Sequence, residues 1–318
     1  MFIKTYTDLD FLKDIFENVP TFSIVDELIN ENENILPWQK LTEMIFQKCE
    51  LNIKSNLHDF ISVSKTNPLF AKIIDAQNNG KIKVLFSGQT PNLDNHKTPT
   101  SVHFTDIVPN QVNCALVSNS ENWKLNILNL SISESIRVNE DIVLNDFNGW
   151  SFISNIKLPI NSAIIVDRYI LSNKTEVEKN LFSILRNLIV NSKGKEKFQL
   201  TIITHKNELF DDGKKVYDFI KQFLENNFPN KVEFGLVLPY KKVPHDRNLI
   251  TNFYRIKSLN SFNFYKYDSS VKYNTEVEIL PLNADKLKSL ENILIELLES
   301  LENSQIIGHK RNRLFNLI

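Results

Sequence analysis

Hydrophobic residues in the second half of the chain form short continuous runs that alternate with stretches of helical spacing. The runs are Ala163–Val166, Leu200–Thr204, Val232–Leu238 and Leu249–Ile256. Continuous apolar runs of about four to eight residues are typical of strands that are buried on both faces. We therefore predict buried strands at these places, and a further strand over Phe262–Tyr267.

The stretches between these runs place apolar residues three and four positions apart, which is the spacing of one helix face. Asn173 begins the first of them, with Glu176 three residues later as in a capping box. Two more helices are predicted over residues 216–224 and 284–302. Strands that alternate with helices predict the α/β class, as a mixed sheet with parallel strands and flanking helices.

Residues 1–80 are predicted to be helical, because their apolar residues recur at spacings of three and four. The ranges are Asp8–Val19, Phe22–Asn30, a longer pattern from Pro37 toward Phe60, and Leu69–Gln77. The last of these has Asn67-Pro68 as a start signal and Gly80 as a stop signal. Strands are predicted to follow over Lys81–Phe86, Val112–Ser118 and Leu125–Ile132.

A turn signal at Asn148-Gly149 and the change of pattern around it predict a domain boundary near residue 150. Residues 1–150 would then form an N-terminal α+β domain of unknown fold and role, and residues 151–318 a second domain. A chain of 318 residues is long enough for two domains.

The net charge of −1 conceals an asymmetry between the two halves. Residues 1–150 carry 12 Lys and Arg against 19 Asp and Glu, a net charge of −7. Residues 151–318 carry 25 against 19, a net charge of +6. The second half is therefore the better partner for an anion such as a phosphate or a nucleic acid, although a charge of this size also fits ordinary surface variation.

Composition narrows the class of protein further. The two cysteines, Cys49 and Cys114, have no redox or metal-ligand spacing, so we expect a cytoplasmic protein. No run of about 18 apolar residues is present, so we predict no membrane span. The histidines His58, His96 and His103 lack ligand spacing, so we expect neither a metal nor a cofactor.

Ionisable residues follow three of the predicted strands. They are Asp167-Arg168, His205-Lys206 and the segment from Val243 to Asn252, which contains His245 and Arg247. Ligands of such sheets bind beyond the carboxyl ends of the strands. We therefore expect a site there, with Arg168, His205, Lys206 and Arg247 as anion-binding residues.

The spacing of His245 and Arg247 suits a phosphate. In an extended segment side chains alternate, so residues two apart lie on the same side. Arg247 can bind two phosphate oxygens through its planar fork. His245 can attack phosphorus as a nucleophile, and Asn252 can orient the imidazole through a hydrogen bond. These three residues are the catalytic candidates. The alternative is structural, with His245 on a surface loop and Arg247 paired with Asp167.

With these residues the sequence resembles the phospholipase D superfamily, whose motif is H-x-K-x4-D. Here the motif reads His245-x-Arg247-x4-Asn252. It most resembles the C-terminal phospholipase-D-like domain of MIT-domain-containing proteins, which has His-Asp-Arg followed by Asn. The resemblance also includes Ile164–Ile170, Leu200–Thr204 and Phe262–Lys266, and covers about residues 164–268.

The resemblance implies a phospholipase-D-like sheet and a phosphate-binding site. Arginine replaces the usual lysine and asparagine the usual aspartate, so binding is retained while catalysis loses a carboxylate. Two functions follow. The first is a non-catalytic binding or regulatory component, whose partner is an anionic ligand or a protein. For this function the resemblance implies a prokaryotic conflict (defence) system as the context. The second is a metal-independent phosphodiesterase or nuclease that acts through a phosphohistidine.

Such enzymes need two copies of the motif around one phosphate, and this chain has one convincing copy. The enzyme would therefore have to be a homodimer. We rank an anionic membrane surface below a protein or nucleic-acid partner, because the N-terminal helices lack a basic amphipathic face.

Overall fold

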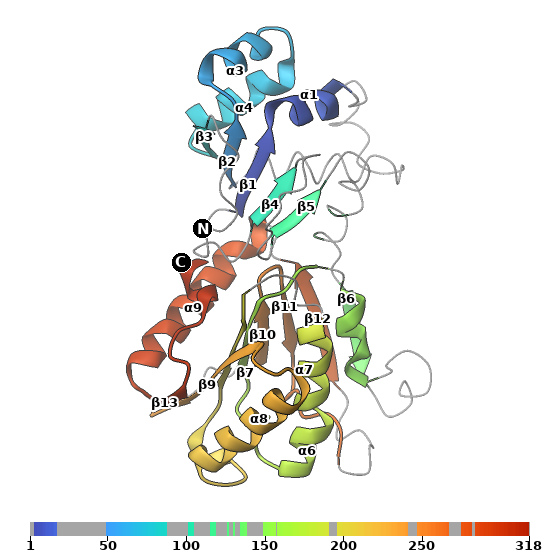
Figure 1. The fold of residues 1–318 in the computed structure, drawn as a ribbon, viewed down its shortest axis with the longest axis vertical. Helices are drawn as coiled ribbons and strands as arrows, with labels where there is room; N and C mark the ends of the chain where they lie inside the picture. The colour runs from blue at the N-terminus through green and yellow to red at the C-terminus, as the bar shows by residue number, and fades with distance from the viewer. Residues whose placement is uncertain are drawn as a thin grey trace. The chain divides into compact units, whose positions relative to one another are not determined.

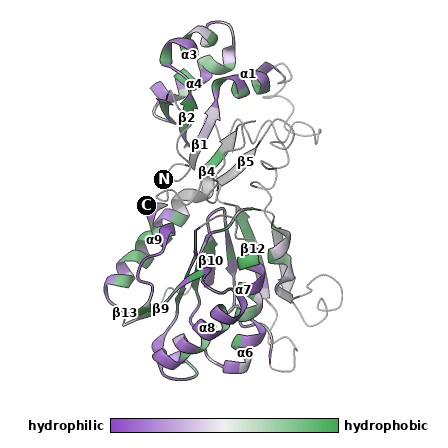
Figure 2. Ribbon diagram, viewed as in Figure 1, coloured by the Kyte–Doolittle hydropathy of each residue, from purple (hydrophilic) through white to green (hydrophobic). Residues whose placement is uncertain are grey.

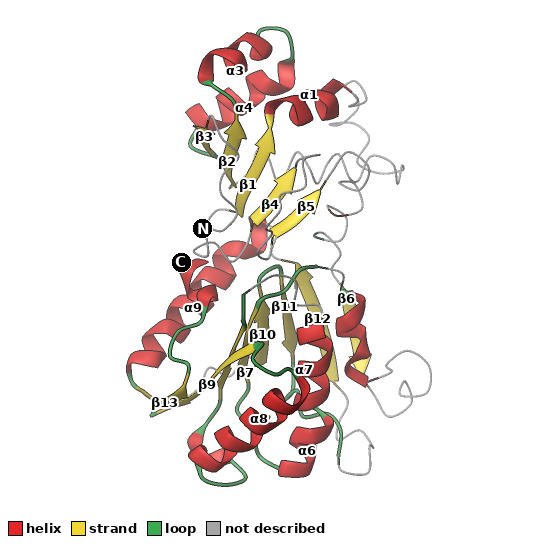
Figure 3. Cartoon of the chain, in the orientation of Figure 1, coloured by secondary structure: helices red, strands yellow, loops and turns green. Residues whose placement is uncertain are grey.

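The computed structural model describes residues 3–17, 49–87, 101–104, 115–118, 126, 130, 134–138, 149–156, 158–190, 196–240, 247–266, 275–281 and 284–317 (Figure 3). The chain divides into two compact units. The N-terminal unit contains residues 1–131 and 283–288, and the C-terminal unit contains residues 132–282 and 289–318. The predicted boundary near residue 150 stays a prediction, and strand β6, which precedes that residue, pairs within the C-terminal sheet.

The N-terminal unit contains a parallel sheet of five described strands in the order β3-β2-β1-β4-β5. Three described helices accompany it (Figure 1). The strands are β1 (Ile3–Asp8), β2 (Cys49–Lys54), β3 (Lys83–Ser87), β4 (Ser101–Phe104) and β5 (Ala115–Ser118). The helices are α1 (Leu9–Glu17), α3 (Leu57–Ser64) and α4 (Pro68–Asn78). The unit therefore combines helices and strands, as predicted, with every described strand parallel.

The prediction that residues 1–80 are helical is wrong at β1 and β2. Leu51 and Ile53 are fully buried and alternate with more polar neighbours, which is the period of a strand. Helix α4 is confirmed with its start signal, because the Asn67 side chain accepts a hydrogen bond from the Leu69 amide. The ranges Phe22–Asn30 and most of Leu125–Ile132 lie outside the described residues.

The C-terminal unit is built on an eight-stranded mixed sheet in the order β13-β9-β8-β7-β10-β11-β12-β6. Strands β7, β8 and β9 run parallel, and each of the other neighbouring pairs is antiparallel. The strands are β6 (Glu134–Val138), β7 (Ser162–Val166), β8 (Phe198–Ile203), β9 (Val232–Pro239), β10 (Arg247–Thr251), β11 (Tyr254–Ser258), β12 (Thr275–Pro281) and β13 (Ser304–Gly308).

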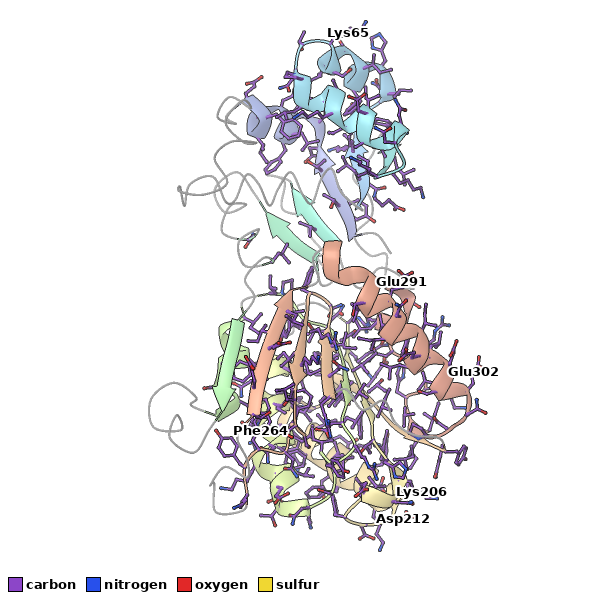
Figure 4. All side chains as sticks on the ribbon, turned by 180° about the vertical axis from the view of Figure 1, so that it is seen from behind. Lys65, Lys206, Asp212, Phe264, Glu291 and Glu302 are labelled. Atoms are coloured by element: carbon purple, nitrogen blue, oxygen red, sulfur yellow. The ribbon has the colours of Figure 1, made fainter. Side chains whose placement is uncertain are left out.

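Helices flank this sheet. Figure 1 shows α6, α7 and α8 in front of it, and Figure 4, from behind, shows α9 beside the strands. Figure 2 shows hydrophobic residues concentrated on the strands and hydrophilic ones on the outer turns of the helices. The helices are α6 (Lys174–Lys179), α7 (Leu181–Val190), α8 (Gly213–Asn227) and α9 (Ala284–Glu302), with 3-10 turns η3 (Gly149–Asn155), η4 (Lys206–Glu208) and η5 (Arg313–Leu317). The predicted mixed sheet flanked by helices is confirmed.

Three predictions for this unit need correction. The run Leu249–Ile256 is not one strand, because a tight turn at residues 252–253 divides it into β10 and β11. The first predicted helix is divided at Asn180 into α6 and α7, although its cap at Asn173 is confirmed. Residues 262–266, the described part of another predicted strand, form an irregular segment in which Phe262 and Phe264 are buried.

Residues after β13 fold back onto the sheet rather than extending into solvent. The Asn312 side chain is buried and donates hydrogen bonds to Ala163 O at 3.0 Å and Gln199 O at 3.2 Å. Arg313 pairs with Glu196 at 2.6 Å, and Leu314 is fully buried. Lys310 and Arg311 remain exposed, so only the part of this segment from Asn312 onward is packed against the sheet.

We expect Gly308→Ala to lower the free energy of unfolding by about 2–4 kcal/mol. Gly308 has a φ of 87°, and an added Cβ would collide with the Tyr217 ring and the Phe234 carbonyl. Gly80→Ala is the matched control, because Gly80 has a φ of 68° with open space around it. Urea denaturation should show a cost of about 1 kcal/mol there. Equal costs at the two positions would contradict the close packing at Gly308.

Candidate functional site

Several of the predicted site residues meet at one edge of the C-terminal sheet. Strands β7 and β8 are parallel, so Asp167 and Thr204 follow them at the same edge. Strand β10 is antiparallel to β7, with Asn248 opposite Val166, so its first residue, Arg247, lies at that edge as well. The residues at this edge therefore come from the carboxyl ends of β7 and β8 and from the amino end of β10.

His245 and Asp246 lie outside the described residues. In the sequence they directly precede Arg247, the first residue of β10. The proposed roles of His245 therefore stay predictions.

Asp167 is the most constrained group at this edge. Its side chain is buried, and its Oδ1 accepts a hydrogen bond from the Tyr169 amide at 2.9 Å. Its Oδ2 accepts from Ser261 Oγ at 2.8 Å and from the Phe262 amide at 2.6 Å. Burial raises the pKa of this carboxyl above its usual value, while these donors and the charge of Arg247 act to lower it.

Arg247 is half-buried, and its guanidinium has only part of its donors satisfied. Its Nη1 donates to the Leu259 carbonyl at 3.3 Å. Its Nε is inaccessible to solvent and has no hydrogen-bond partner among the residues that the structure describes. A buried donor without a partner costs roughly 1–3 kcal/mol, so this atom calls for an acceptor that the described residues do not supply.

The predicted anion-binding residues on the neighbouring strand ends are arranged differently. Arg168 donates to Glu208 Oε1 through both Nε and Nη2, at 3.2 and 2.8 Å. A carboxylate thus already occupies this guanidinium, which argues against anion binding by Arg168. His205 caps η4, with its Nδ1 accepting from the Asn207 amide at 3.2 Å. Lys206 is exposed and is labelled at this end of the unit in Figure 4.

Asn252 lies at the other end of β10 from Arg247. Its Oδ1 accepts hydrogen bonds from the amides of Asn161 at 3.0 Å and Ser162 at 3.1 Å. Its Nδ2 donates to Asn161 Oδ1 at 2.9 Å. These contacts fix the turn after β10 to the beginning of β7, so they give Asn252 a structural role and no support for orienting an imidazole at the Arg247 end.

A buried polar network that the sequence pattern did not predict reaches Asp167. Asn263 Nδ2 donates to Glu176 Oε2 at 2.7 Å, and Asn180 Nδ2 donates to Asn263 Oδ1 at 2.7 Å. Through Ser261 the same segment also reaches Asp167. Polar residues that interrupt a run of aromatic residues, as Asn263 does between Phe262 and Phe264, were the available signal.

An aromatic cluster holds this segment in place. Trp150 stacks on Phe264 with ring centroids 4.8 Å apart and planes inclined at 18°. It also contacts Phe262 edge-on at 5.9 Å. Figure 4 labels Phe264 at the same end of the unit as Lys206. The network and the cluster together fix the segment that covers Asp167.

The described side chains show no group of three or more His, Cys, Asp or Glu that could hold a metal ion. A span long and apolar enough to cross a membrane is likewise missing from the helices in the described part of the chain.

Comparison with known proteins yields similarities of fold and none of sequence. No protein-family model matches the chain, and no curated protein sequence matches it. Solved structures that resemble it include phospholipase D family members. One is Nuc from Salmonella typhimurium, with 10% identity and a TM-score of 0.35 over 56% of this chain and 99% of that one.

NucT from Helicobacter pylori has 10% identity and a TM-score of 0.33 over 56% of this chain and 100% of its own. TrmBL2, an archaeal chromatin protein, has 13% identity and a TM-score of 0.29, over 56% of this chain and 54% of its own. Similarities this loose do not assign the chain to a family.

We expect Asn252→Ala to lower the free energy of unfolding by roughly 2–4 kcal/mol, because it leaves two buried amides without an acceptor. The affinity of the folded protein for inorganic phosphate should stay unchanged. Chemical denaturation and calorimetric titration measure the two quantities. A large loss of affinity without a loss of stability would instead show that Asn252 takes part in binding.

The raised pKa of Asp167 predicts a pH dependence of stability. Above its unfolded pKa, near 3.8, the folded protein holds this proton more tightly than the unfolded chain. The stabilisation is therefore complete at lower pH and is lost as the pH rises through the folded pKa. We expect the unfolding free energy of the wild type, minus that of Asp167→Asn, to fall as the pH rises above about 4. A flat or rising difference between pH 4 and pH 8 would contradict this.

Proposed function

We propose that the C-terminal unit is a phospholipase-D-like domain that binds a phosphate-bearing anion, a phosphodiester or nucleic acid, through Arg247 together with His245. The observation that carries this proposal is the buried, unpartnered Nε of Arg247. A guanidinium with a free buried donor at the edge of a sheet fits an oxyanion better than it fits a purely structural role.

The charge balance around Arg247 supports the proposal. Asp167 is near enough for the charge of Arg247 to lower its pKa, while the hydrogen bonds of Asp167 come from Tyr169, Ser261 and Phe262. The donors of Arg247 are thus not consumed by the carboxylate. The net charge of +6 over residues 151–318 adds long-range attraction for an anion.

The residues present favour binding over turnover. Asn252 carries no charge, and its described contacts are at the far end of β10. An imidazole that becomes charged during catalysis would therefore lack a carboxylate from this position. A binding or regulatory component is the role that we propose. A prokaryotic conflict system is its proposed context on the basis of the resemblance alone. The basis for a cytoplasmic location is the cysteine content.

The alternative is a metal-independent phosphodiesterase. His245 stands two residues before Arg247, so an extended chain would bring both side chains to one phosphate. A ring nitrogen of His245 would displace an alcohol from phosphorus, and water would then cleave the phosphorus–nitrogen bond. One motif per chain requires a homodimer for this reaction, with the second His245 as the general acid.

We expect Arg247→Ala to weaken binding of a fluorescent single-stranded oligothymidylate at least ten-fold in fluorescence anisotropy, because a charged hydrogen-bond donor is lost. Lys221→Ala is the control, since Lys221 is an exposed cation on α8 paired with Glu225. It should change affinity less than two-fold. Unchanged affinity in Arg247→Ala would refute the proposed function.

The wild type and His245→Ala decide between binding and hydrolysis. In the presence of a chelator, cleavage of bis(p-nitrophenyl) phosphate that disappears in His245→Ala would establish the phosphodiesterase. Light scattering should then show a dimer. Binding without cleavage would support the non-catalytic role.

A further inference from the structure

A second buried polar atom without a partner lies directly beside Arg247. Strands β10 and β11 are antiparallel, and their register places Arg247 opposite Ser258. Ser258 is 2% exposed, and its Oγ has no hydrogen-bond partner among the residues that the structure describes. Both members of this cross-strand pair therefore have a buried polar atom without a hydrogen-bond partner in the described part of the chain.

The register fixes how near the two side chains are. Residues directly opposite each other in an antiparallel pair point to the same face of the sheet, with Cβ atoms about 4.5–5.5 Å apart. The Nε of Arg247 and the Oγ of Ser258 therefore lie on one face, at the edge where Asp167 also lies. An oxygen that enters between these two side chains would be able to accept from both donors.

The chemistry of the two donors selects the acceptor. Arg247 Nε–H can only donate, and Ser258 Oγ–H can donate to the same oxygen. The guanidinium charge makes a negatively charged oxygen the best match, because charge-assisted hydrogen bonds are the stronger ones. The Leu259 carbonyl holds Nη1 of Arg247, which fixes the direction of the remaining donors.

We propose that Ser258 is an anion-binding residue of this site, and that Arg247 Nε and Ser258 Oγ together bind one oxygen of a phosphodiester. This inference rests on the proposed function and adds a residue to it. Ser258 holds the oxygen from β11 while Arg247 holds it from β10, so the phosphate is fixed across the seam between the two strands.

Tyr254, on the same strand, also has an unpartnered hydroxyl, but it lacks the neighbouring cation that Ser258 has in Arg247. The Tyr254 hydroxyl is also buried and without a partner in the described part of the chain, and it lies on the same face of β11. Tyr254 is opposite Pro281 on β12, at the end of β11 away from Arg247. It has no cation as its cross-strand neighbour there, so it carries no site and provides a matched control.

The test compares Ser258→Ala, Tyr254→Phe and Arg247→Ala with the full-length wild type. Binding of a fluorescent oligothymidylate is measured by anisotropy, and binding of inorganic phosphate by calorimetry. We expect Ser258→Ala to weaken binding roughly ten-fold or more, since it removes one hydrogen bond to a charged group. Tyr254→Phe should leave the affinity unchanged.

Thermal unfolding separates a loss of binding from a loss of structure. Removing a buried hydroxyl that has no partner should leave the Tm of the free protein unchanged or higher, in both Ser258→Ala and Tyr254→Phe. Saturating phosphate or oligonucleotide should raise the Tm of wild type and Tyr254→Phe, and should raise that of Ser258→Ala much less. If the oligonucleotide raises the Tm, the site binds a nucleic-acid phosphodiester. If only inorganic phosphate raises the Tm, the site binds free phosphate.

The outcomes separate this inference from the proposed function. If Arg247→Ala weakens binding and Ser258→Ala does not, the role of Ser258 is refuted and the function stands. If neither substitution weakens binding, the proposed function fails and the inference fails with it. If Ser258→Ala and Tyr254→Phe weaken binding equally, the effect of Ser258 is structural and the inference is overturned.

Discussion

The buried carboxylate of Asp167 is the constraint on which the arrangement of this edge depends. A charge removed from water must be matched by donors or by a nearby cation, or it becomes protonated. Here the amides of Tyr169 and Phe262 and the hydroxyl of Ser261 serve it, with the charge of Arg247 close by. The segment after β11 must therefore cross over the end of β7, and the asparagine and aromatic contacts beneath it hold that crossing in place.

The antiparallel direction of β10 determines which side chains lie at this edge. In a wholly parallel sheet every strand delivers its carboxyl end to the ligand side. Strand β10 runs the other way and delivers its amino end, so Arg247 arrives beside Asp167 from the opposite chain direction. Because β11 returns immediately, Ser258 comes to the same edge only eleven residues later in the chain. A short hairpin thus contributes both a cation and a hydroxyl to one position.

The sequence was informative where local pattern decides structure, and not where distant contacts decide it. Buried strands such as β7 and β9 were predictable, because continuous apolar runs are their signature. Strand β1 was not, since its Thr5 and Thr7 are buried without being apolar. Arg247 was identifiable from its motif, whereas the fate of Asn252 depends on Asn161, 91 residues away in the chain, and that of Arg168 on Glu208, 40 residues away.

The docking of Asn312 has a consequence for the order in which the unit is assembled. Its amide bonds to Ala163, a residue 149 positions earlier, and it lies between β7 and β8. These two strands emerge from the ribosome long before the amino end of β7, where Ala163 lies, is closed. The nascent sheet must therefore remain open at that end, with buried carbonyls still exposed to water, until the segment carrying Asn312 and Leu314 has been synthesised.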